Sequence, residues 1–344
     1  MKNILNIGVF IVLLQSANCL TKSENMNKIS EYFILLFSTL IGMNFMISSG
    51  EFLMFYLALE LATIPMAALV AYNTINQKSA EAGVKLILSA AFSSGIMLFG
   101  ISLFYGQFGS TYFEQLSVVS MATPLAVLAL IFFLSGLSFK ISLVPFHLWT
   151  ADVYEGSPVN ITSYLSVISK GAAVFILTIF LFTIFRTMVE VWTNIIYILA
   201  ILTMTIGNLF AIRQQNIKRF LAFSSIAQAG FILLGVIGTT SLGMATVIYF
   251  MLIYIFSNLG AFGVVSVIAD NSGKENIDDY NGLYHTNPKL SLIMMFSLFS
   301  LAGIPPIAGF FGKFFLFTAA AEQGYYWLVL IAVINATISL YYYL

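Results

Sequence analysis

The sequence predicts an all-α polytopic membrane protein. Of its 344 residues, 60% are hydrophobic and only 8% are charged, whereas a soluble globular chain carries about 25% charged residues. Its apolar residues gather in long stretches, and about 20 apolar residues suffice for a helix to cross the hydrocarbon core. These stretches predict about 11 transmembrane helices, at residues 4–20, 30–49, 51–72, 82–105, 122–148, 159–185, 192–212, 220–238, 244–268, 289–320 and 325–344.

The first apolar stretch has two interpretations. Lys2, the apolar run to Leu14 and the following residues QSANC are compatible with a cleaved signal-like segment. However, no small-residue cleavage site of the A-x-A type follows the run, and the next predicted helix begins soon after it. We therefore expect residues 1–29 to form a transmembrane helix and a loop, with the signal peptide as the alternative.

Lysine and arginine predict the orientation of the helices, because loops rich in these residues face the cytoplasm. One side of the predicted membrane has only Lys2 and Arg186. The other side has Lys22, Lys28, Lys78, Arg213, Lys218, Arg219, Lys274 and Lys289. The second side is expected to face the cytoplasm, or the matrix if the membrane belongs to an organelle.

Five charged residues are predicted to lie inside the spans. They are Glu60, Lys85, Lys140, Lys170 and Lys313. A lysine near the bilayer centre costs about 2.5–3.5 kcal/mol even on a lenient insertion scale, so each should meet water or a partner and is a functional candidate. For Lys85, which follows Glu81 by one helical turn near a loop, an i,i+4 ion pair or a side chain that reaches the interface is the alternative.

Two of the predicted spans are interrupted by proline. Pro145 follows Lys140 by five residues, and Pro305 and Pro306 precede Lys313 in the stretch LAGIPPIAGFFGKFF. Proline removes a backbone donor and clashes with the carbonyl four residues earlier. Carbonyl groups freed in this way are tolerated in a membrane only where protein or a water-filled cavity covers them. The sequence therefore predicts two broken helices, each with local hydration beside a lysine.

The two interrupted spans also predict an internal repeat. Inverted repeats with one discontinuous helix in each half are typical of membrane transporters. We expect residues 30–185 to form one five-helix repeat and residues 186–344 to form the second. Two unrelated proline kinks are the alternative, although kinks alone do not require a lysine at both places.

Four motifs resemble one known family. They are EAGVKLILSAAFSSGIMLFG (81–100), FKISLVPFHLWTADVYEGSP (139–158), NIKRFLAFSSIAQAG (216–230) and FSLAGIPPIAGFFGKFFLF (299–317). From about residue 30 to its end, the chain resembles the antiporter-like subunit N family of respiratory complex I, the proton-pumping NADH:quinone oxidoreductase. It departs from that family at Gln228, where many relatives have histidine. The resemblance also implies that the sequence starts at the family's third helix and is truncated within the thirteenth.

The resemblance implies which residues carry the function. Matched motif by motif, the family's functional glutamate falls on Glu60, and its lysines fall on Lys85, Lys140, Lys170 and Lys313. Together they imply a proton path near the membrane midplane. In this path, displacing or neutralising Glu60 would make Lys140 release its proton. The proton would then pass to Lys170, and on to Lys313 and the outer side.

Other polar residues near this path are further candidates. His147 is a candidate for proton relay because histidine titrates near neutral pH. Beside Trp149 at a helix end, however, it can equally anchor the membrane interface. Hydroxyl groups that can hold water along the path are those of Ser138, Ser142, Ser169, Tyr254 and Ser257.

Redox cofactors and metals are not expected in this chain. The sequence has no G-x-G-x-x-G nucleotide motif, and its single cysteine, Cys19, allows neither a disulfide within the chain nor an iron–sulfur site. The resemblance implies that NADH, FMN, iron–sulfur clusters and quinone belong to partner subunits. Those partners are other membrane-arm subunits and, through them, the peripheral redox arm. A net charge of zero gives no indication of nucleic-acid binding.

We therefore expect a proton-translocating membrane subunit of NADH:quinone oxidoreductase, embedded in a bacterial inner membrane or, as the alternative, a mitochondrial inner membrane. A stand-alone cation/proton antiporter of related fold is the second hypothesis, and it would work without a redox arm. The third is a membrane scaffold that conducts nothing, which the intramembrane charges argue against.

Overall fold

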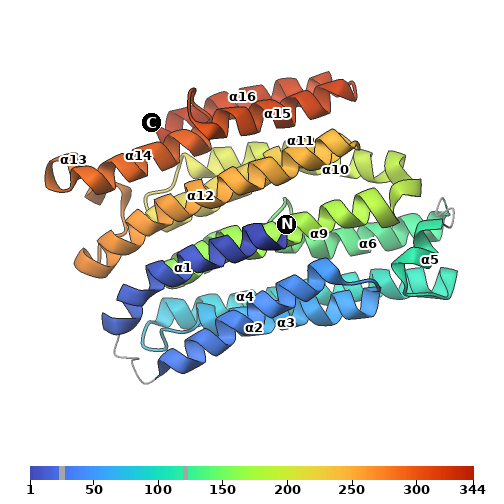
Figure 1. Cartoon of the computed structure of the whole chain (residues 1–344), viewed down its shortest axis with the longest axis horizontal. Coiled ribbons are helices and arrows are strands. Elements are labelled where there is room, and N and C mark those ends of the chain that lie inside the picture. The colour runs from blue at the N-terminus through green and yellow to red at the C-terminus, as the bar shows by residue number, and fades with distance from the viewer. Residues whose placement is uncertain (23–27, 119–122) are drawn as a thin grey trace.

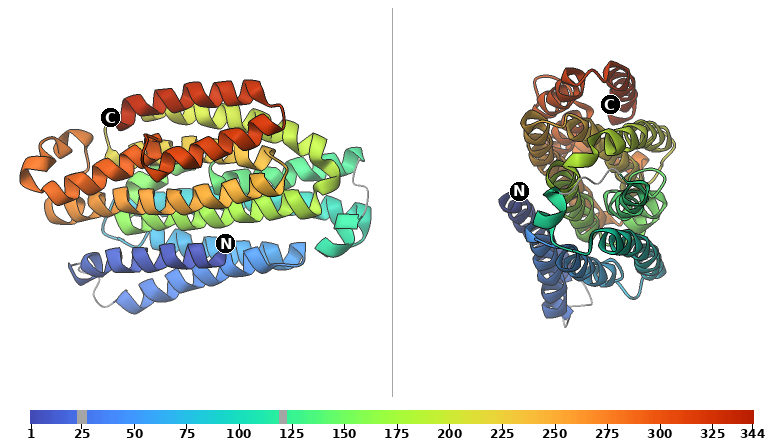
Figure 2. Two further views of the ribbon diagram at one scale, coloured as in Figure 1. Left: turned by 45° about the horizontal axis from the view of Figure 1, so that its top comes forward. Right: turned by 90° about the vertical axis from the view of Figure 1, so that its right-hand side faces the viewer.

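Long helices that run side by side form the whole molecule (Figure 1). The computed structural model describes residues 1–22, 28–118 and 123–344, and within these ranges helices are the only regular elements. From α2 onward the chain moves across the bundle, so that α2 and α3 lie at one edge and α15 and α16 at the other, whereas α1 lies between α2 and α12 (Figures 1 and 2). The prediction of an all-α polytopic membrane protein is confirmed.

In the described ranges, nine helices are long and apolar enough to cross a membrane. They are α2 (Ile29–Ser48), α3 (Phe52–Val70), α4 (Gln77–Phe108), α6 (Pro124–Ile141), the run Val159–Ile184, the run Arg186–Ala211 that contains α10 (Val189–Ala211), α11 (Ile217–Ile237), α12 (Ser241–Ser272) and α16 (Tyr326–Tyr343).

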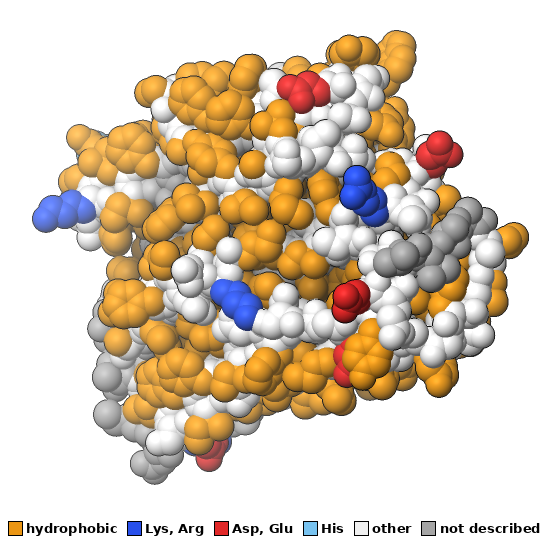
Figure 3. Space-filling view, turned by 45° about the vertical axis from the view of Figure 1, so that its right-hand side comes forward, with side chains coloured by type: hydrophobic (Ala, Val, Ile, Leu, Met, Phe, Trp, Pro, Cys, Tyr) orange, Lys and Arg blue, Asp and Glu red, His pale blue; other side chains and the backbone are white. Residues whose placement is uncertain are grey.

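Further helices complete the bundle. They include α1 (Lys2–Lys22), α5 (Phe113–Val118), α7 (Leu148–Gly156), α13 (Leu283–Thr286), α14 (Pro288–Ala302) and α15 (Ala308–Glu322). Apolar side chains cover most of the face shown in Figure 3, and charged side chains on it are few and scattered. In contrast, α11 is buried along its whole length by the surrounding helices. The bundle therefore has an apolar outer surface for lipid and a protein-enclosed centre.

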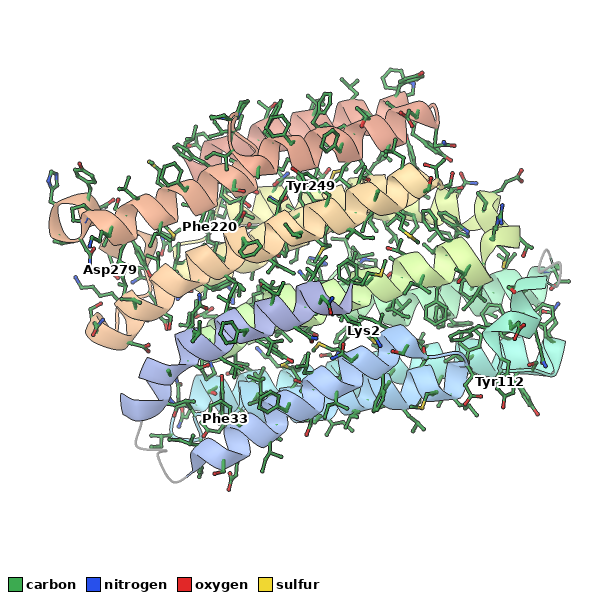
Figure 4. All side chains as sticks on the ribbon, in the orientation of Figure 1. Lys2, Phe33, Tyr112, Phe220, Tyr249 and Asp279 are labelled. Carbon is green, nitrogen blue, oxygen red and sulfur yellow. The ribbon has the colours of Figure 1, made fainter. Side chains whose placement is uncertain are left out.

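The loops lie at the two ends of the bundle, and hydrogen bonds and ion pairs join them there. At one end, the Tyr72 hydroxyl donates to the Lys28 carbonyl over 2.8 Å, and Lys218 pairs with Glu275 over 2.8 Å. Asp279 lies at this end and Tyr112 at the opposite end (Figure 4). The loops around Lys28 and Lys218 thus share one side, as their positive charge predicts. That this side faces the cytoplasm stays a prediction.

The first broken helix is confirmed. α6 ends at Ile141, and α7 begins only at Leu148. Protein groups cover part of the freed backbone, because the Val144 amide donates to the Thr203 hydroxyl over 3.0 Å. The Trp149 indole likewise donates to the Phe139 carbonyl over 3.1 Å. The side chains of Thr203 and Trp149 therefore form some of the backbone hydrogen bonds for which the sequence predicts water.

The second broken helix is also confirmed, between the end of α14 at Ala302 and the start of α15 at Ala308. Gly303 ends α14 with φ +85°, a left-handed conformation that glycine adopts without steric cost. Lys140 precedes its break, whereas Lys313 follows its own. The two lysines are therefore not at equivalent places relative to the breaks, and the division into two inverted five-helix repeats stays a prediction.

Candidate functional site

Lys140 lies in the last turn of α6, and its side chain is buried. Its Nζ donates to the Thr63 hydroxyl of α3 over 2.6 Å. The predicted partner Glu60 lies one turn earlier on α3. No direct ion pair joins these two residues, which both belong to the described part of the chain. Lys140 therefore has a neutral partner in contact and an acidic partner farther away.

A small cavity lies beside Lys140 and Thr63. Its volume is about 10 Å³, which is roughly what one water molecule needs. Glu60 is half-buried, and its Oε1 is enclosed without a hydrogen-bond partner among the described residues. An enclosed carboxylate oxygen without a donor is costly. The arrangement around Lys140 therefore has both a place for a water molecule and an unsatisfied acceptor nearby.

Lys170 is more deeply enclosed, with 2% of its surface exposed. It begins α9 (Lys170–Ile179), directly after a π-helical turn at Leu165–Ser169, and such turns are frequent at functional sites. Its Nζ donates to the Ser225 hydroxyl of α11 over 2.9 Å and lies 6.0 Å from the centre of the Tyr154 ring. Within the described chain, this lysine again meets neutral groups.

Lys313 is buried in α15 beside the second break. Its Nζ donates to the Ala302 carbonyl over 2.9 Å, and Ala302 is the last residue of α14. The ammonium group thus satisfies a carbonyl that the break leaves free, at a helix end where the macrodipole favours a cation. It also lies 4.7 Å from the centre of the Phe231 ring. Lys140 lies in the last turn of its own helix, α6, where the macrodipole also favours a cation, but its ammonium group donates to Thr63 rather than to a freed carbonyl.

One face of α11 connects two of the lysines. Ser225 contacts Lys170, and Phe231 contacts Lys313. Gln228 lies between them in sequence, three residues from each, so the three side chains share a helix face. Its amide donates to the Leu301 carbonyl over 2.9 Å and to the Tyr343 hydroxyl over 3.1 Å. Gln228 therefore joins α11 to α14 and α16.

The hydroxyl candidates have different surroundings. Ser257 donates to the Ser300 hydroxyl over 2.7 Å, and Tyr254 donates to the Ser166 carbonyl over 3.5 Å. Ser142 Oγ is buried at the first break without a partner in the described ranges. His147, in the same break, is buried, and its Nδ1 has no described partner. A relay role for His147 stays a prediction.

The expected burial of Lys85 is wrong. Its side chain is 43% exposed and pairs with Glu81 over 2.7 Å and with Asp152 of α7 over 2.8 Å, so the alternative of an i,i+4 pair is confirmed. The reason is the length of α4, which has 32 residues where about 20 suffice to span. Its first turns therefore extend beyond the apolar region, and Lys85 lies apart from the three buried lysines.

Lys85 belongs to an ion-pair network that sequence reasoning missed. Arg219 of α11 pairs with Asp152 over 2.7 Å and with Glu155 over 2.9 Å, so the network ties α4, α7 and α11 together. Burial alone would raise the pKa of Asp152, but hydrogen bonds from Lys85 and Arg219 hold it below its usual range. The signal in the sequence was the pair of acids in WTADVYEG, directly after the first break.

Arg219→Gln is expected to destabilise the chain at pH 7 by about 1 kcal/mol, because partly exposed ion pairs contribute little individually. Since the pKa of Asp152 is lowered in the folded state, its contribution is present at neutral pH and is lost as pH falls through that pKa. The difference from the parent should therefore shrink in acid. Thermal unfolding of the purified complex at several pH values measures this, with exposed Arg213→Gln as control. An equal loss in both variants would contradict it.

Comparisons with known proteins show the family of this chain. The family model for the membrane region of NADH:quinone oxidoreductases and Mrp antiporters matches residues 49–339. NADH-quinone oxidoreductase subunit N of Phocaeicola vulgatus is 56% identical, over 100% of this chain and 73% of that protein. The corresponding subunit N of Azobacteroides pseudotrichonymphae is 52% identical, over 100% and 72%.

Solved structures show the same architecture. A chain of respiratory complex I from Thermus thermophilus is 29% identical and superposes with a TM-score of 0.82, over 100% of this chain and 75% of that one. A chain of the Mrp complex from Dietzia has a TM-score of 0.88 over 99% and 64%, and at 23% identity this likeness shows the fold alone. The chain therefore belongs to the NADH:quinone oxidoreductase/Mrp antiporter membrane-subunit family, and within it to the subunit N proteins.

Proposed function

We propose that this chain is the proton-translocating, antiporter-like membrane subunit of an NADH:quinone oxidoreductase in a bacterial inner membrane. The observation that carries the proposal is the set of buried lysines at Lys140, Lys170 and Lys313, each hydrogen-bonded to a neutral oxygen. A buried ammonium group inside a membrane is costly and marks ion pathways. Lysine, unlike arginine, also exchanges its proton readily in a protein.

The path runs across the bundle rather than along one helix. Lys140 lies on α6, Lys170 on α9 and Lys313 on α15, and the buried face of α11 reaches from Lys170 to Lys313. A proton released by Lys140 would move to Lys170 and then, past Gln228, to Lys313. Water held by polar side chains would bridge the gaps between them.

Glu60 supplies the switch in this proposal. Its carboxylate favours the charged form of Lys140, so a change that moves or neutralises Glu60 would release a proton from Lys140. The absence of a direct contact suits this role, because a charge acting at a distance can be weakened by a small displacement. Lys85 lies outside the buried set, and its part in the path is the least supported.

Electron transfer belongs to partner subunits in this proposal. NADH, FMN, iron–sulfur clusters and quinone would be bound there, and other membrane-arm subunits would transmit the driving force to this chain. The subunit N relatives favour this assembly over a stand-alone antiporter. Within the described residues, no group of three or more His, Cys, Asp or Glu side chains is placed to hold a metal.

Glu60→Gln tests the switch. The variant keeps the shape of the side chain and removes its charge, so NADH-driven quinone reduction and coupled proton translocation are expected to slow while assembly is unchanged. The measurement is both rates in membrane vesicles, normalised to assembled complex. Glu31→Gln, at an exposed position of α2, is the matched control. Coupled turnover at the parent rate in Glu60→Gln would contradict the pairing with Lys140.

A further inference from the structure

A surface cavity outside the lysine path lies between α1 and α12. Its volume is about 110 Å³, and Gln15, Gly263, Ser266 and Asp270 are among its lining residues. Asp270 is exposed near the end of α12, whereas Ser266, one turn deeper, is 5% exposed. Gln15 of α1 donates to the Leu259 carbonyl of α12 over 2.9 Å, and this bond holds the two walls of the cavity together. The cavity thus opens at the predicted cytoplasmic end and reaches a buried hydroxyl.

Two rows of polar residues continue inward from this cavity. On α12, polar residues occur at four-residue intervals with Phe262 as the single interruption: Tyr254, Asn258, Ser266 and Asp270. Residues four apart form a ridge on one side of a helix. On the facing run, α8 (Val159–Tyr164) and the π-helical turn, the polar residues follow intervals of three and four: Asn160, Ser163, Ser166 and Lys170.

Contacts join the two rows at both ends. Near the cavity, the Ser266 hydroxyl lies 3.3 Å from Asp270 Oδ2 and 3.5 Å from Asn160 Oδ1, so it can donate to either. Deeper in the bundle, the Tyr254 hydroxyl lies 3.5 Å from the Ser166 carbonyl. The polar rows therefore face each other from the cavity to the neighbourhood of Lys170.

The Ser266 contacts differ from the usual contacts of a buried hydroxyl in a helix. A serine or threonine in a helix commonly bonds the carbonyl three or four residues earlier, as Thr246 does with Gly243. Ser266 instead contacts the side chains of Asp270, on its own helix, and Asn160, on α8. A hydroxyl beside an exposed carboxylate can take up a proton from it while giving its own proton to water, and Asn160 Oδ1 orients this hydroxyl toward the interior.

The inner part of the passage contains polar atoms without a hydrogen bond of good geometry. Among the described residues these are Ser166 Oγ, Asn258 Oδ1 and Tyr154 Oη, although the Tyr154 and Tyr254 hydroxyls lie close to Ser166. Leaving a polar group unsatisfied in a membrane interior costs several kcal/mol. Water suits these atoms as a partner, because a buried water typically bridges about three polar groups, and the Tyr154 ring lies 6.0 Å from the Lys170 ammonium group.

We propose that Asp270, Ser266 and Asn160 form a proton uptake passage from the cytoplasmic end to Lys170. This inference rests on the proposed function and deepens it, since it gives Lys170 its own supply of protons, separate from Glu60 and Lys140. Asp270 binds the proton at the surface, and Ser266 transfers it to water inside the bundle. Water held between the two polar rows then carries the proton to Lys170.

The passage is tested with two isosteric substitutions at Ser266. Ser266→Thr keeps the hydroxyl, and Ser266→Val has the shape of threonine without it. NADH-driven proton translocation per assembled complex is expected to fall several-fold in the valine variant and to stay near the parent in the threonine variant. Ser272→Val is the control, because this exposed hydroxyl bonds only its own helix at Ile268.

Asp270 gives a second test at an exposed position, where assembly is not at risk. Asp270→Asn is expected to lower translocation and Asp270→Glu to preserve it. Parent rates in both Ser266→Val and Asp270→Asn would overturn the passage, and so would equal losses in the valine and threonine variants, which would indicate packing. Lys170→Met, measured alongside, separates the two proposals. If it stops translocation while the passage variants do not, only the passage fails; if it too translocates normally, the proposed function fails.

Discussion

Lys140→Met is expected to lower NADH-driven proton translocation by about 10²-fold, the scale that a positioned proton-transfer group contributes. Methionine fills the space of the lysine stem but holds no proton. Folding should be preserved, because the change removes a buried charge whose insertion costs about 2.5–3.5 kcal/mol. The Thr63 hydroxyl also keeps a partner, since it lies 2.6 Å from the Leu59 carbonyl.

The measurement is proton uptake or release by reconstituted vesicles, normalised to assembled complex. Lys289→Met is the control, because Lys289 is exposed in the first turn of α14. If Lys140→Met translocates like this control, Lys140 is not part of the path. If it fails to assemble, Thr63→Val, which removes the hydroxyl partner of the ammonium and keeps the shape, should lower translocation without removing the lysine.

Lys170→Met is expected to stop translocation at least as completely. In the proposed path, protons from Lys140 and from the Asp270 passage both reach Lys170, so no other route toward Lys313 remains. Packing should tolerate the change, because the Ser225 hydroxyl keeps its 2.7 Å hydrogen bond to the Ala222 carbonyl.

Ser225→Ala is the matched variant. It leaves Lys170 in place and removes only its hydroxyl partner, so translocation should fall less than in Lys170→Met. The measurement is again proton translocation per electron pair in vesicles. Translocation at the parent rate in Lys170→Met, with normal assembly, would mean that the path does not require Lys170, whereas complete loss in both variants would mean that it requires the Ser225 hydroxyl as well.

Much of the fold could be predicted from the sequence because a bilayer leaves few alternatives. Apolar stretches long enough to span must be helices, and a proline within such a stretch must break one. The two breaks and the burial of Lys170 and Lys313 follow from these rules. The placement of Lys313 on the Ala302 carbonyl gives the physical reason why a break and a lysine occur together.

The partners of the lysines could not be predicted. Thr63 lies 77 residues from Lys140, and Ser225 lies 55 residues from Lys170. Only the packing of separate helices decides which of many serines and threonines meets an ammonium group. For Lys85, in contrast, the sequence predicts burial that the folded chain does not have. Its neighbours in sequence are apolar enough to suggest burial, but the helix is longer than the membrane requires and Asp152 holds it at the surface.

The most direct test of the proton path is Lys140→Arg, compared with Lys140→Met in the same vesicles. Arginine keeps the positive charge next to Thr63 and Glu60 but stays protonated at any accessible pH. The account predicts that NADH-driven proton translocation is lost in the arginine variant nearly as fully as in the methionine variant, with both assembled. Translocation at the parent rate in Lys140→Arg, with loss in Lys140→Met, would contradict it and make Lys140 a fixed counter-ion of Glu60.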